Sequence, residues 1–370
     1  MSGAIASYDL IVIGAGIIGA SCADAASADG LRVAIVEPGP IGGGATAAAM
    51  GHLVAMDDDP AELALARYSL HEWEAFAHLK EAEFSRCGTL WVARSDTELN
   101  AASKRAARLG AAGVDAQTVD AKTLYELEPA LVPGLSGGML VPNEAVMYPP
   151  RVALYLVKRA QSRGARFYAG RRAQALQQGG VRLDDRTLLR GPVLVATGCS
   201  LPELLPALPM RARKGHLVIT ERYPNLVHHQ LLELGYADSA HGDADSSVAF
   251  NVQPRPTGQI LIGSSREFNA ADAAVSPVMV QRMLERSFAF VPALRNLQAL
   301  RCWTGFRPTT PDGRPYLGAV PGTTDQWVAA GHEGLGVTTA LGSARLLLDL
   351  IQQREPAIDP TPYAPSRMIA

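Results

Sequence analysis

The sequence predicts a mixed α/β fold, in which a Rossmann-like dinucleotide-binding domain carries an inserted antiparallel sheet. A strand, a glycine turn, a helix and a second strand follow one another within residues 8–38. Short segments rich in Val and Ile occupy residues 214–264, and 370 residues exceed one comfortable hydrophobic core. We therefore expect two interleaved domains: a dinucleotide-binding domain of residues 1–85, 148–212 and 303–370, and a substrate domain of residues 86–147 and 213–302.

The glycine turn has the spacing that a bound dinucleotide requires. Gly14 permits the tight turn, Gly16 lets the backbone approach a pyrophosphate, and Gly19 allows the helix to pack closely on the strand. The positive end of the helix favours the phosphates, and Glu37, after the second strand, can accept both hydroxyls of an adenosine ribose. The alternative is a buried strand and helix without a ligand. Both strands and the acid accompany the motif, which favours the dinucleotide.

Composition and charge restrict the class of protein. Apolar residues make up 48% and charged residues 19% of the chain, as in a globular protein, and a net charge of −2 gives no reason to expect nucleic acid or an anionic membrane as a partner. Neither a secretory signal nor an apolar run of about 18 residues is evident. The 4 cysteines are far apart and form no Cys-x-x-Cys pair. We expect a cytoplasmic protein without a disulfide framework or a metal site.

A glycine and alanine run at residues 40–54 directly follows the ribose acid. Such a run lets backbone amides pass close to a large planar or anionic ligand, although a flexible surface loop has the same composition. His52 is the one titratable group in it. Its side chain either faces the ligand or is packed and hydrogen bonded.

The middle of the chain alternates between helical and strand patterns. Acidic residues 57–59 and Pro60 are typical of a helix start. A strand ending in Ala196-Thr197-Gly198 is typical of the carboxyl edge of a parallel sheet, where nucleotide cofactors bind, although a core strand before a turn has the same pattern. The expected helices are residues 61–80, 98–110 and 148–163, the expected strands are 87–93, 165–176, 181–183 and 191–198, and 124–142 resembles a connector.

The later part of the chain predicts an inserted sheet and a return to the first domain. Strands are expected at 214–221, 247–253, 259–264 and 327–330, with a turn at 257–258 and a covering helix at 279–290. The glycine-rich loop 331–336 opens a helix through about residue 352. The positive end of that helix could stabilise negative charge on a cofactor.

Four ordered motifs together resemble the FAD-dependent oxidoreductases of the D-amino acid oxidase, glycine oxidase and sarcosine oxidase type. They are the glycine turn with Glu37, the run 44–46, the strand end 196–198, and Gly-Phe-Arg-Pro-x-x-Pro-Asp-Gly followed by Gly-His-x-Gly-x-Gly. The resemblance spans residues 8–352 and implies a glutathione-reductase-type flavoprotein fold. The run 44–54 with the nearby acidic triplet is most similar to the FAD subunits of bacterial D-hydroxyproline dehydrogenases.

The resemblance implies that Arg307 binds the substrate carboxylate, a role that suits a guanidinium because it forms two parallel hydrogen bonds and stays charged. The alternative is a structural arginine in a Pro-rich loop. A hydride would pass from the substrate Cα to flavin N5 and leave an imine, so no dedicated base is required. His52 is the nearest plausible catalytic polar group, and Tyr148, Glu333 and Arg266 could shape the pocket.

The cofactor contacts expected from these motifs include several backbone positions. Gly305 occupies the position of the flavin-tethering cysteine of sarcosine oxidases, with Cys302 displaced, so non-covalent FAD is expected. Gly334 replaces a second arginine of glycine oxidase, which favours a proline-like substrate. The expected cofactor-binding residues are Gly14, Gly16, Ile18, Gly19, Glu37, Pro38, Gly44, Ala45, Thr46, Gly51, His52, Leu53, Ala173, Ala196, Thr197, Gly198, Gly334, Leu335, Gly336, Val337 and Thr338.

Several functions remain open at this point. The first is an FAD-dependent dehydrogenase of a D-amino or cyclic imino acid, such as hydroxy-D-proline, with iron–sulfur or second flavoprotein subunits as electron acceptors. The second is an oxidase that uses dioxygen, as for glycine or sarcosine. The third is an FAD subunit for electron transfer that carries out no amine chemistry. A nicotinamide dehydrogenase would explain Glu37 but leaves the glycine loop near the C-terminus without a role.

Overall fold

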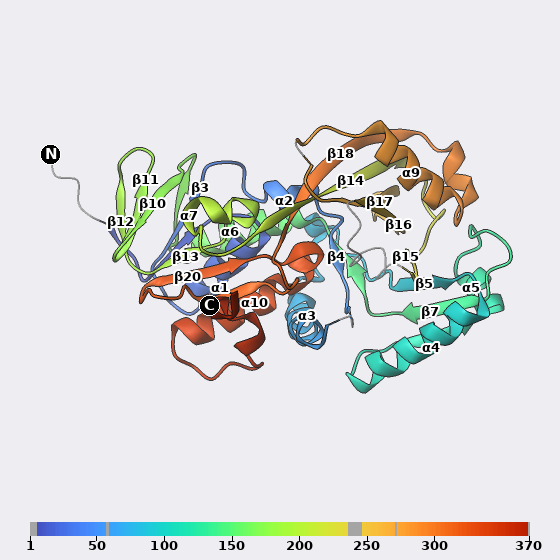
Figure 1. The fold of residues 1–370 in the computed structure, drawn as a ribbon, viewed down its shortest axis with the longest axis horizontal. Coiled ribbons are helices and arrows are strands. Elements are labelled where there is room, and N and C mark those ends of the chain that lie inside the picture. The colour runs from blue at the N-terminus through green and yellow to red at the C-terminus, as the bar shows by residue number, and fades with distance from the viewer. Residues whose placement is uncertain (1–5, 57–58, 236–245, 271, 369–370) are drawn as a thin grey trace.

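Two large sheets form the two halves of the molecule (Figure 1). The computed structural model describes residues 6–56, 59–235, 246–270 and 272–368. The left half of Figure 1 contains a six-stranded sheet with helices and a small sheet, and the right half contains an eight-stranded sheet with helices of its own. This arrangement agrees with the expected α/β fold.

The six-stranded sheet has the order β19-β20-β13-β2-β3-β9, and all of its strands are parallel except β19. Alternate residues of a strand point to opposite faces. Leu10 and Val12 therefore pack among the helices, whereas Ile11 and Ile13 pack against a four-stranded sheet, β1-β12-β11-β10, on the other face. The strands are β2 Leu10–Ile13, β3 Val33–Glu37, β9 Arg166–Ala169, β13 Val193–Val195, β19 Tyr316–Ala319, β20 Gln326–Ala330, β1 Ala6–Ser7, β10 Ala173–Gln177, β11 Gly180–Leu183 and β12 Leu188–Arg190.

Helices cover the first face of this sheet. The helix after the glycine turn, α1, packs against α6 and α10, and α10 also packs against α3. The helices of this half are α1 Ile17–Ala28, α2 Gly44–Ala48, α3 Pro60–Trp73, α6 Pro149–Ser162, α7 Leu201–Leu204 and α10 Gly336–Ile351. The 3-10 turns along the described chain are η1 Glu74–Phe76, η2 Lys80–Ala82, η3 Gly198–Ser200, η4 Pro292–Asn296, η5 Glu333–Leu335, η6 Thr361–Tyr363 and η7 Pro365–Met368.

The eight-stranded sheet has the order β18-β14-β17-β16-β15-β5-β7-β6, in which only β15 and β5 pair in parallel. A two-stranded ladder, β4 with β8, lies at its junction with the first half (Figure 1). The elements are β5 Thr89–Ala93, β6 Gln117–Asp120, β7 Gly137–Val141, β14 Arg211–Arg222, β15 Gln230–Glu233, β16 Ser246–Pro254, β17 Gln259–Glu267, β18 Ala299–Thr309, β4 His52–Leu53, β8 Ala145–Val146, α4 Asp96–Ala111, α5 Ala121–Leu127 and α9 Pro277–Phe288.

The helix expected at 61–80 is shorter than predicted. It ends at Trp73 and the chain continues as the 3-10 turn η1 to Phe76, and the extended backbone of Leu79 prevents a continuous helix from reaching residue 80. Its start is confirmed, since the Asp59 carboxylate accepts hydrogen bonds from the first backbone N–H groups, at 2.8 and 3.0 Å. Asp57 and Asp58 lie outside the described residues.

The predicted connector 124–142 is wrong, because it contains the end of α5 and the whole of β7. Gly137 and Gly138 belong to β7, and a Cβ on Gly138 would lie 2.3 Å from the carbonyl oxygen of Trp91 on β5. Close backbone approach requires glycine at position 138, whereas Gly134 lies in a turn. The domain limits expected at residues 213 and 303 fall inside β14 and β18. The division of the chain into two domains stays a prediction.

Residues Glu333–Ile351 are long and apolar enough to cross a membrane by length and composition. In the most apolar 18-residue stretch of this segment, 61% is buried inside the protein, where α10 packs against α1 and α3. Such burial is typical of a core helix.

Candidate active site

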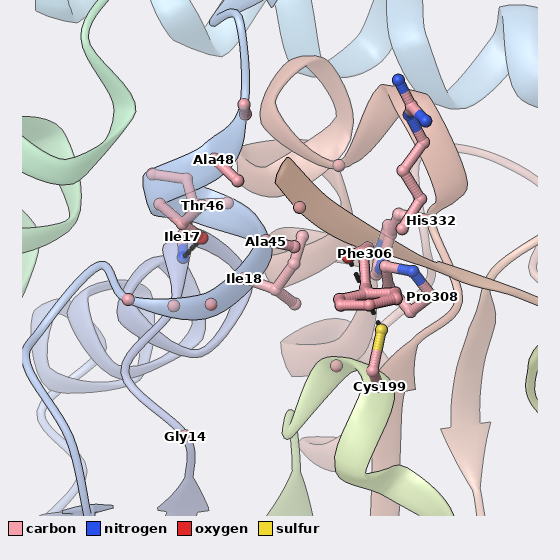
Figure 2. Close-up of a pocket in the computed structure, with 18 of the residues that line it drawn as sticks. Gly14, Ile17, Ile18, Ala45, Thr46, Ala48, Cys199, Phe306, Pro308 and His332 are labelled. Atoms are coloured by element: carbon pink, nitrogen blue, oxygen red, sulfur yellow. Dashed lines mark hydrogen bonds between the residues drawn. The ribbon is translucent and has the colours of Figure 1, made fainter. Parts of the chain in front are cut away.

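A cavity of about 750 Å³ lies where the two halves meet. Its walls come from the glycine turn, residues 37–52, the end of β13, and strands β14 and β18. Figure 2 shows Ile17, Thr46 and Ala45 on one side and Phe306 and Cys199 on the other. The volume is in the range of pockets that bind cofactors and drug-sized ligands.

The glycine turn is held by contacts that only glycine allows. Gly14 has φ +105°, and a Cβ on it would lie 2.4 Å from the carbonyl oxygen of Ala196. A Cβ on Gly19 would lie 2.0 Å from the carbonyl oxygen of Gly14, so the helix rests directly on the turn. Thr46 Oγ1 accepts the N–H of Ile17 at 2.9 Å, which ties the run 44–48 to the start of α1 (Figure 2).

Glu37 closes this end of the cavity. Its two carboxylate oxygens accept the backbone N–H groups of Ala15 and Gly39, each at 2.7 Å. A carboxylate has about four lone-pair positions, so two remain for hydroxyl donors. The site can therefore bind an adenosine ribose while the turn stays in place.

Arg307 lies at the other end of the cavity, on β18. Its guanidinium lies over Gly215 of β14 and donates a hydrogen bond to the carbonyl oxygen of Ser265 at 3.2 Å. A Cβ at position 215 would lie only 2.5 Å from Arg307 Nη1. The missing side chain of Gly215 therefore creates the space that the guanidinium fills.

Two buried arginines and one glutamate surround this guanidinium. Arg213 pairs with Arg307 across β14 and β18, and Arg266 lies on β17, on the other side of β14. Arg213 Nη1 is 3.7 Å from Glu333 Oε1. Burial alone would raise the pKa of Glu333, but the charges of Arg307, Arg266 and Arg213 outweigh it and hold that pKa below its usual value. Positive charge exceeds negative charge here, which favours an anionic ligand.

His52 is packed and hydrogen bonded, and it also lines the cavity, so both of the alternatives considered for it apply. Its Nδ1 contacts Gln230 Oε1, and its Nε2 lies 3.4 Å from Met50 Sδ and 3.4 Å from Asn251 Nδ2. Burial lowers the pKa of His52 to about 4; the bond to Gln230 opposes this shift, and the charge of Arg307 adds to it. The ring is therefore neutral at pH 7.

Residues 9–350 match the sequence profile of a known protein family, which is described as FAD dependent oxidoreductase. The chain belongs to this family. Glycine oxidase of Pseudomonas aeruginosa is 30% identical over 397 residues, which cover 97% of this chain and 99% of that protein. D-amino acid dehydrogenase of Rhizorhabdus wittichii is 29% identical over 283 residues, covering 74% of this chain and 65% of that protein. The crystal structure of glycine oxidase from Geobacillus kaustophilus has a TM-score of 0.88 at 25% identity, covering 99% and 100% of the two chains.

The protein is thus an FAD-dependent oxidoreductase, and the family and fold expected from the sequence are confirmed. The cavity fits FAD. Besides the glycine turn and Glu37, Thr197 Oγ1 is buried at the cavity wall without a hydrogen-bond partner among the described residues, and suits a ligand. No side chain caps α10, whose first residues Gly336 and Val337 line the cavity, so its positive end can face the cofactor.

Most residues expected to bind the flavoprotein's cofactor line this cavity, as does Arg307. The cofactor-binding residues confirmed in the wall are Gly14, Gly16, Ile18, Glu37, Pro38, Gly44, Ala45, Thr46, Gly51, His52, Ala173, Ala196, Thr197, Gly198, Gly334, Gly336 and Val337. Arg266 and Glu333, which were expected to shape the pocket, also line it. Among the described residues, no group of three or more His, Cys, Asp or Glu side chains could hold a metal ion.

Five predicted positions do not line the cavity of this oxidoreductase. Gly19 packs directly against the backbone of Gly14 in the turn, and Leu53 is buried in the core among the helices. Leu335 packs on a separate apolar cluster that includes Val54 and Trp91. Thr338 Oγ1 accepts the N–H of Val54 at 3.2 Å and donates to the carbonyl oxygen of His52 at 3.0 Å, so it positions the wall. Tyr148 is the residue before the first turn of α6, where its side chain makes no capping hydrogen bond, and its ring lies under the guanidinium of Arg255.

Sequence reasoning missed the cavity residues that long-range pairing supplies. Asn251, Ser264, Thr304 and Phe306 lie on strands β16, β17 and β18 of the eight-stranded sheet. The sequences around Asn251 and Ser264 read only as strand, so no local signal marked them, whereas Phe306 belongs to the motif around Arg307 and Thr304 precedes it, although neither was expected to line the cavity. Cys302, considered as a flavin tether, lies on an exposed part of β18 and is not part of the cavity wall.

Proposed function

We propose that this protein oxidises the C–N bond of a small D-amino acid or cyclic imino acid whose carboxylate binds Arg307. The observation that supports this is the Arg307 guanidinium, which occupies the space above Gly215 at the cavity wall, inside a cluster with excess positive charge. Bound FAD supplies the chemistry by accepting a hydride from the substrate Cα. Two relatives are named glycine oxidase and D-amino acid dehydrogenase, which agrees with an amino acid substrate.

The residues of the chain prepare the substrate for this step. Arg307 fixes the carboxylate with two hydrogen bonds and so orients the Cα–H bond. A hydride leaves readily only from a neutral amine. The positive charges of Arg213, Arg266 and Arg307, which hold the pKa of Glu333 below its usual value, also favour loss of a proton from a bound ammonium group because like charges repel. The proton passes to solvent, and a dedicated protein base is not required.

A cyclic substrate such as hydroxy-D-proline is our first candidate. Gly334 lines the cavity, and a Cβ on it would meet no heavy atom within 4 Å, so this wall has open space. A secondary ring amine fills more of that space than glycine does. The electron acceptor is either dioxygen or a partner subunit that carries an iron–sulfur cluster or a second flavin.

The test of substrate class is anaerobic bleaching of the bound flavin by a panel of D-amino acids, glycine, sarcosine and prolines. We expect the Arg307→Ala variant to retain FAD and to bind the best substrate about 100-fold more weakly, because a charged hydrogen-bonding partner is lost. Arg151→Ala, at an exposed arginine at the start of α6, is the control. Unchanged bleaching in Arg307→Ala would refute the role of Arg307 as the carboxylate anchor, whereas an unmodified protein whose flavin no compound of the panel bleaches would favour a subunit for electron transfer that carries out no amine chemistry.

The electron acceptor is tested separately. Peroxide formed under air is compared with reduction of an artificial dye under nitrogen, with the same substrate. Dye reduction with little peroxide supports a dehydrogenase. Stoichiometric peroxide without a preference for the dye would identify an oxidase.

A further inference from the structure

A buried amide on β15 fixes the proton positions at the wall of the flavin cavity. Gln230 is fully buried, and its Nε2 donates to the backbone carbonyl oxygen of Ala145 and to Thr89 Oγ1, each at 3.1 Å. A backbone carbonyl oxygen can only accept a hydrogen bond, so the atom that faces it is the amide nitrogen. The other end of the same amide, the oxygen Oε1, is therefore directed at His52.

The orientation of this amide determines the tautomer of His52. Amide oxygens have lone pairs and no proton, so His52 Nδ1, which contacts Gln230 Oε1, must carry the hydrogen. The ring is neutral, because burial lowers the pKa of His52 to about 4. A neutral ring with a proton on Nδ1 has a lone pair on Nε2. His52 Nε2 lies close to Met50 and Asn251, which both line the flavin cavity.

Asn251 donates to this lone pair and carries an acceptor of its own. Its Nδ2 is 3.4 Å from His52 Nε2, in the direction that an N–H donor requires. The oxygen Oδ1 of the same amide is buried without a hydrogen-bond partner among the described residues. A buried acceptor without a partner destabilises the protein, and a donor group on a ligand can remove that cost. The single lone pair of His52 Nε2 is used by Asn251, so Asn251 Oδ1 is the acceptor that this wall offers, whereas Arg307 offers only donors.

We propose that Gln230 holds His52 in the Nδ1–H tautomer, so that His52 Nε2 accepts the N–H of Asn251 Nδ2 and leaves Asn251 Oδ1 to accept an N–H of the substrate amine. This inference rests on the proposed function and names the part of the site that recognises the amine. Arg307 binds the carboxylate and Asn251, oriented by His52, binds the nitrogen, so the two contacts orient an amino or imino acid in one direction. Gln230 acts through His52 and is a positioning residue.

The tautomer is read directly by NMR of the FAD-bound protein labelled with ¹⁵N-histidine. We expect His52 Nδ1 to carry the proton and Nε2 to show the chemical shift of an unprotonated ring nitrogen. Gln230→Leu removes the acceptor for Nδ1–H, and we expect the proton to shift toward Nε2. A proton on Nε2 of the unmodified protein would overturn the proposal.

Kinetics tests the second part of the proposal. With Gln230→Leu and Asn251→Leu we expect the KM of the amino acid to rise about tenfold or more, because the amine loses a buried acceptor. The Ki of a carboxylic acid inhibitor that lacks nitrogen should change less than about threefold, since Arg307 is intact. Equal losses for both ligands would show general damage to the site and would refute a selective amine subsite.

Gln253 provides a matched control. It is also fully buried, and its Nε2 donates to the carbonyl oxygen of Met50 at 2.8 Å, but it does not line the cavity. Gln253→Leu removes a buried amide of the same kind and should leave the His52 spectrum unchanged. If no amino or imino acid bleaches the flavin of the unmodified protein, the proposed function fails and the amine subsite fails with it, but a Nδ1–H signal would still confirm the role of Gln230. A change of the His52 tautomer in Gln253→Leu would count against the specific role of Gln230.

Discussion

Substituting Gly215 by Ala should displace the carboxylate anchor without damaging the fold. The added Cβ would lie 2.5 Å from Arg307 Nη1, 2.8 Å from Nη2 and 2.9 Å from Cζ. The atoms that it meets are the far end of a flexible side chain, so the guanidinium moves and the strand does not. Restoring ordinary van der Waals contact requires a shift of about 1 Å, and a misplacement of that size costs about 100-fold in reactivity. This loss corresponds to about 2.7 kcal/mol.

The assay is anaerobic flavin bleaching with the best substrate of the panel, combined with flavin absorbance and thermal unfolding. We expect Gly215→Ala to retain FAD and its melting temperature while the second-order rate constant of flavin reduction falls about 100-fold. Gly110→Ala, in α4, is the matched control, because a Cβ there meets nothing within 4 Å. A Gly215→Ala variant with a normal rate constant of flavin reduction would refute the role of this space, and through it the assignment of Arg307.

Three further predictions concern the cofactor and stability. Gly19→Ala should be purified with little FAD, as measured by the ratio of flavin to protein absorbance, because its Cβ would lie 2.0 Å from the backbone oxygen of Gly14; normal FAD content would contradict this. Burial raises the pKa of Glu144 to about 7, so its charged form is disfavoured in the folded state, and Glu144→Gln should stabilise the protein at pH 8 by up to about 3 kcal/mol in urea unfolding. Burial lowers the pKa of His52 to about 4 and that of His332 to about 3, so the stability that they contribute is complete above pH 6.5 and is lost as pH falls toward 4. Glu144 opposes this trend between pH 4.5 and 7. The free energy of unfolding should therefore fall by about 1 kcal/mol per pH unit from pH 6 to 5 in the unmodified protein, and roughly twice as steeply in Glu144→Gln. Equal slopes in the two proteins would exclude this explanation.

The sequence alone determined the cofactor end of this protein. The turn at Gly14, the helix that follows it and Glu37 are neighbours along the chain, and their roles depend on local backbone geometry. Such features can be read from residue type and spacing, because the turn, the helix and the acid lie within about thirty residues of one another. The motif around Arg307 also marked the substrate end, although only through resemblance to a family.

The tertiary structure alone decided how the substrate end is built. Gly215 has no local signal, and its role appears only when β14 pairs with β18 and brings it under Arg307. Gln230 and His52 are 178 residues apart in sequence and meet because β15 and β4 lie at the same junction. Strand register decides which side chains share a face, and register depends on the packing of the whole sheet. A histidine whose tautomer is fixed by a distant amide can therefore be recognised only in the folded chain.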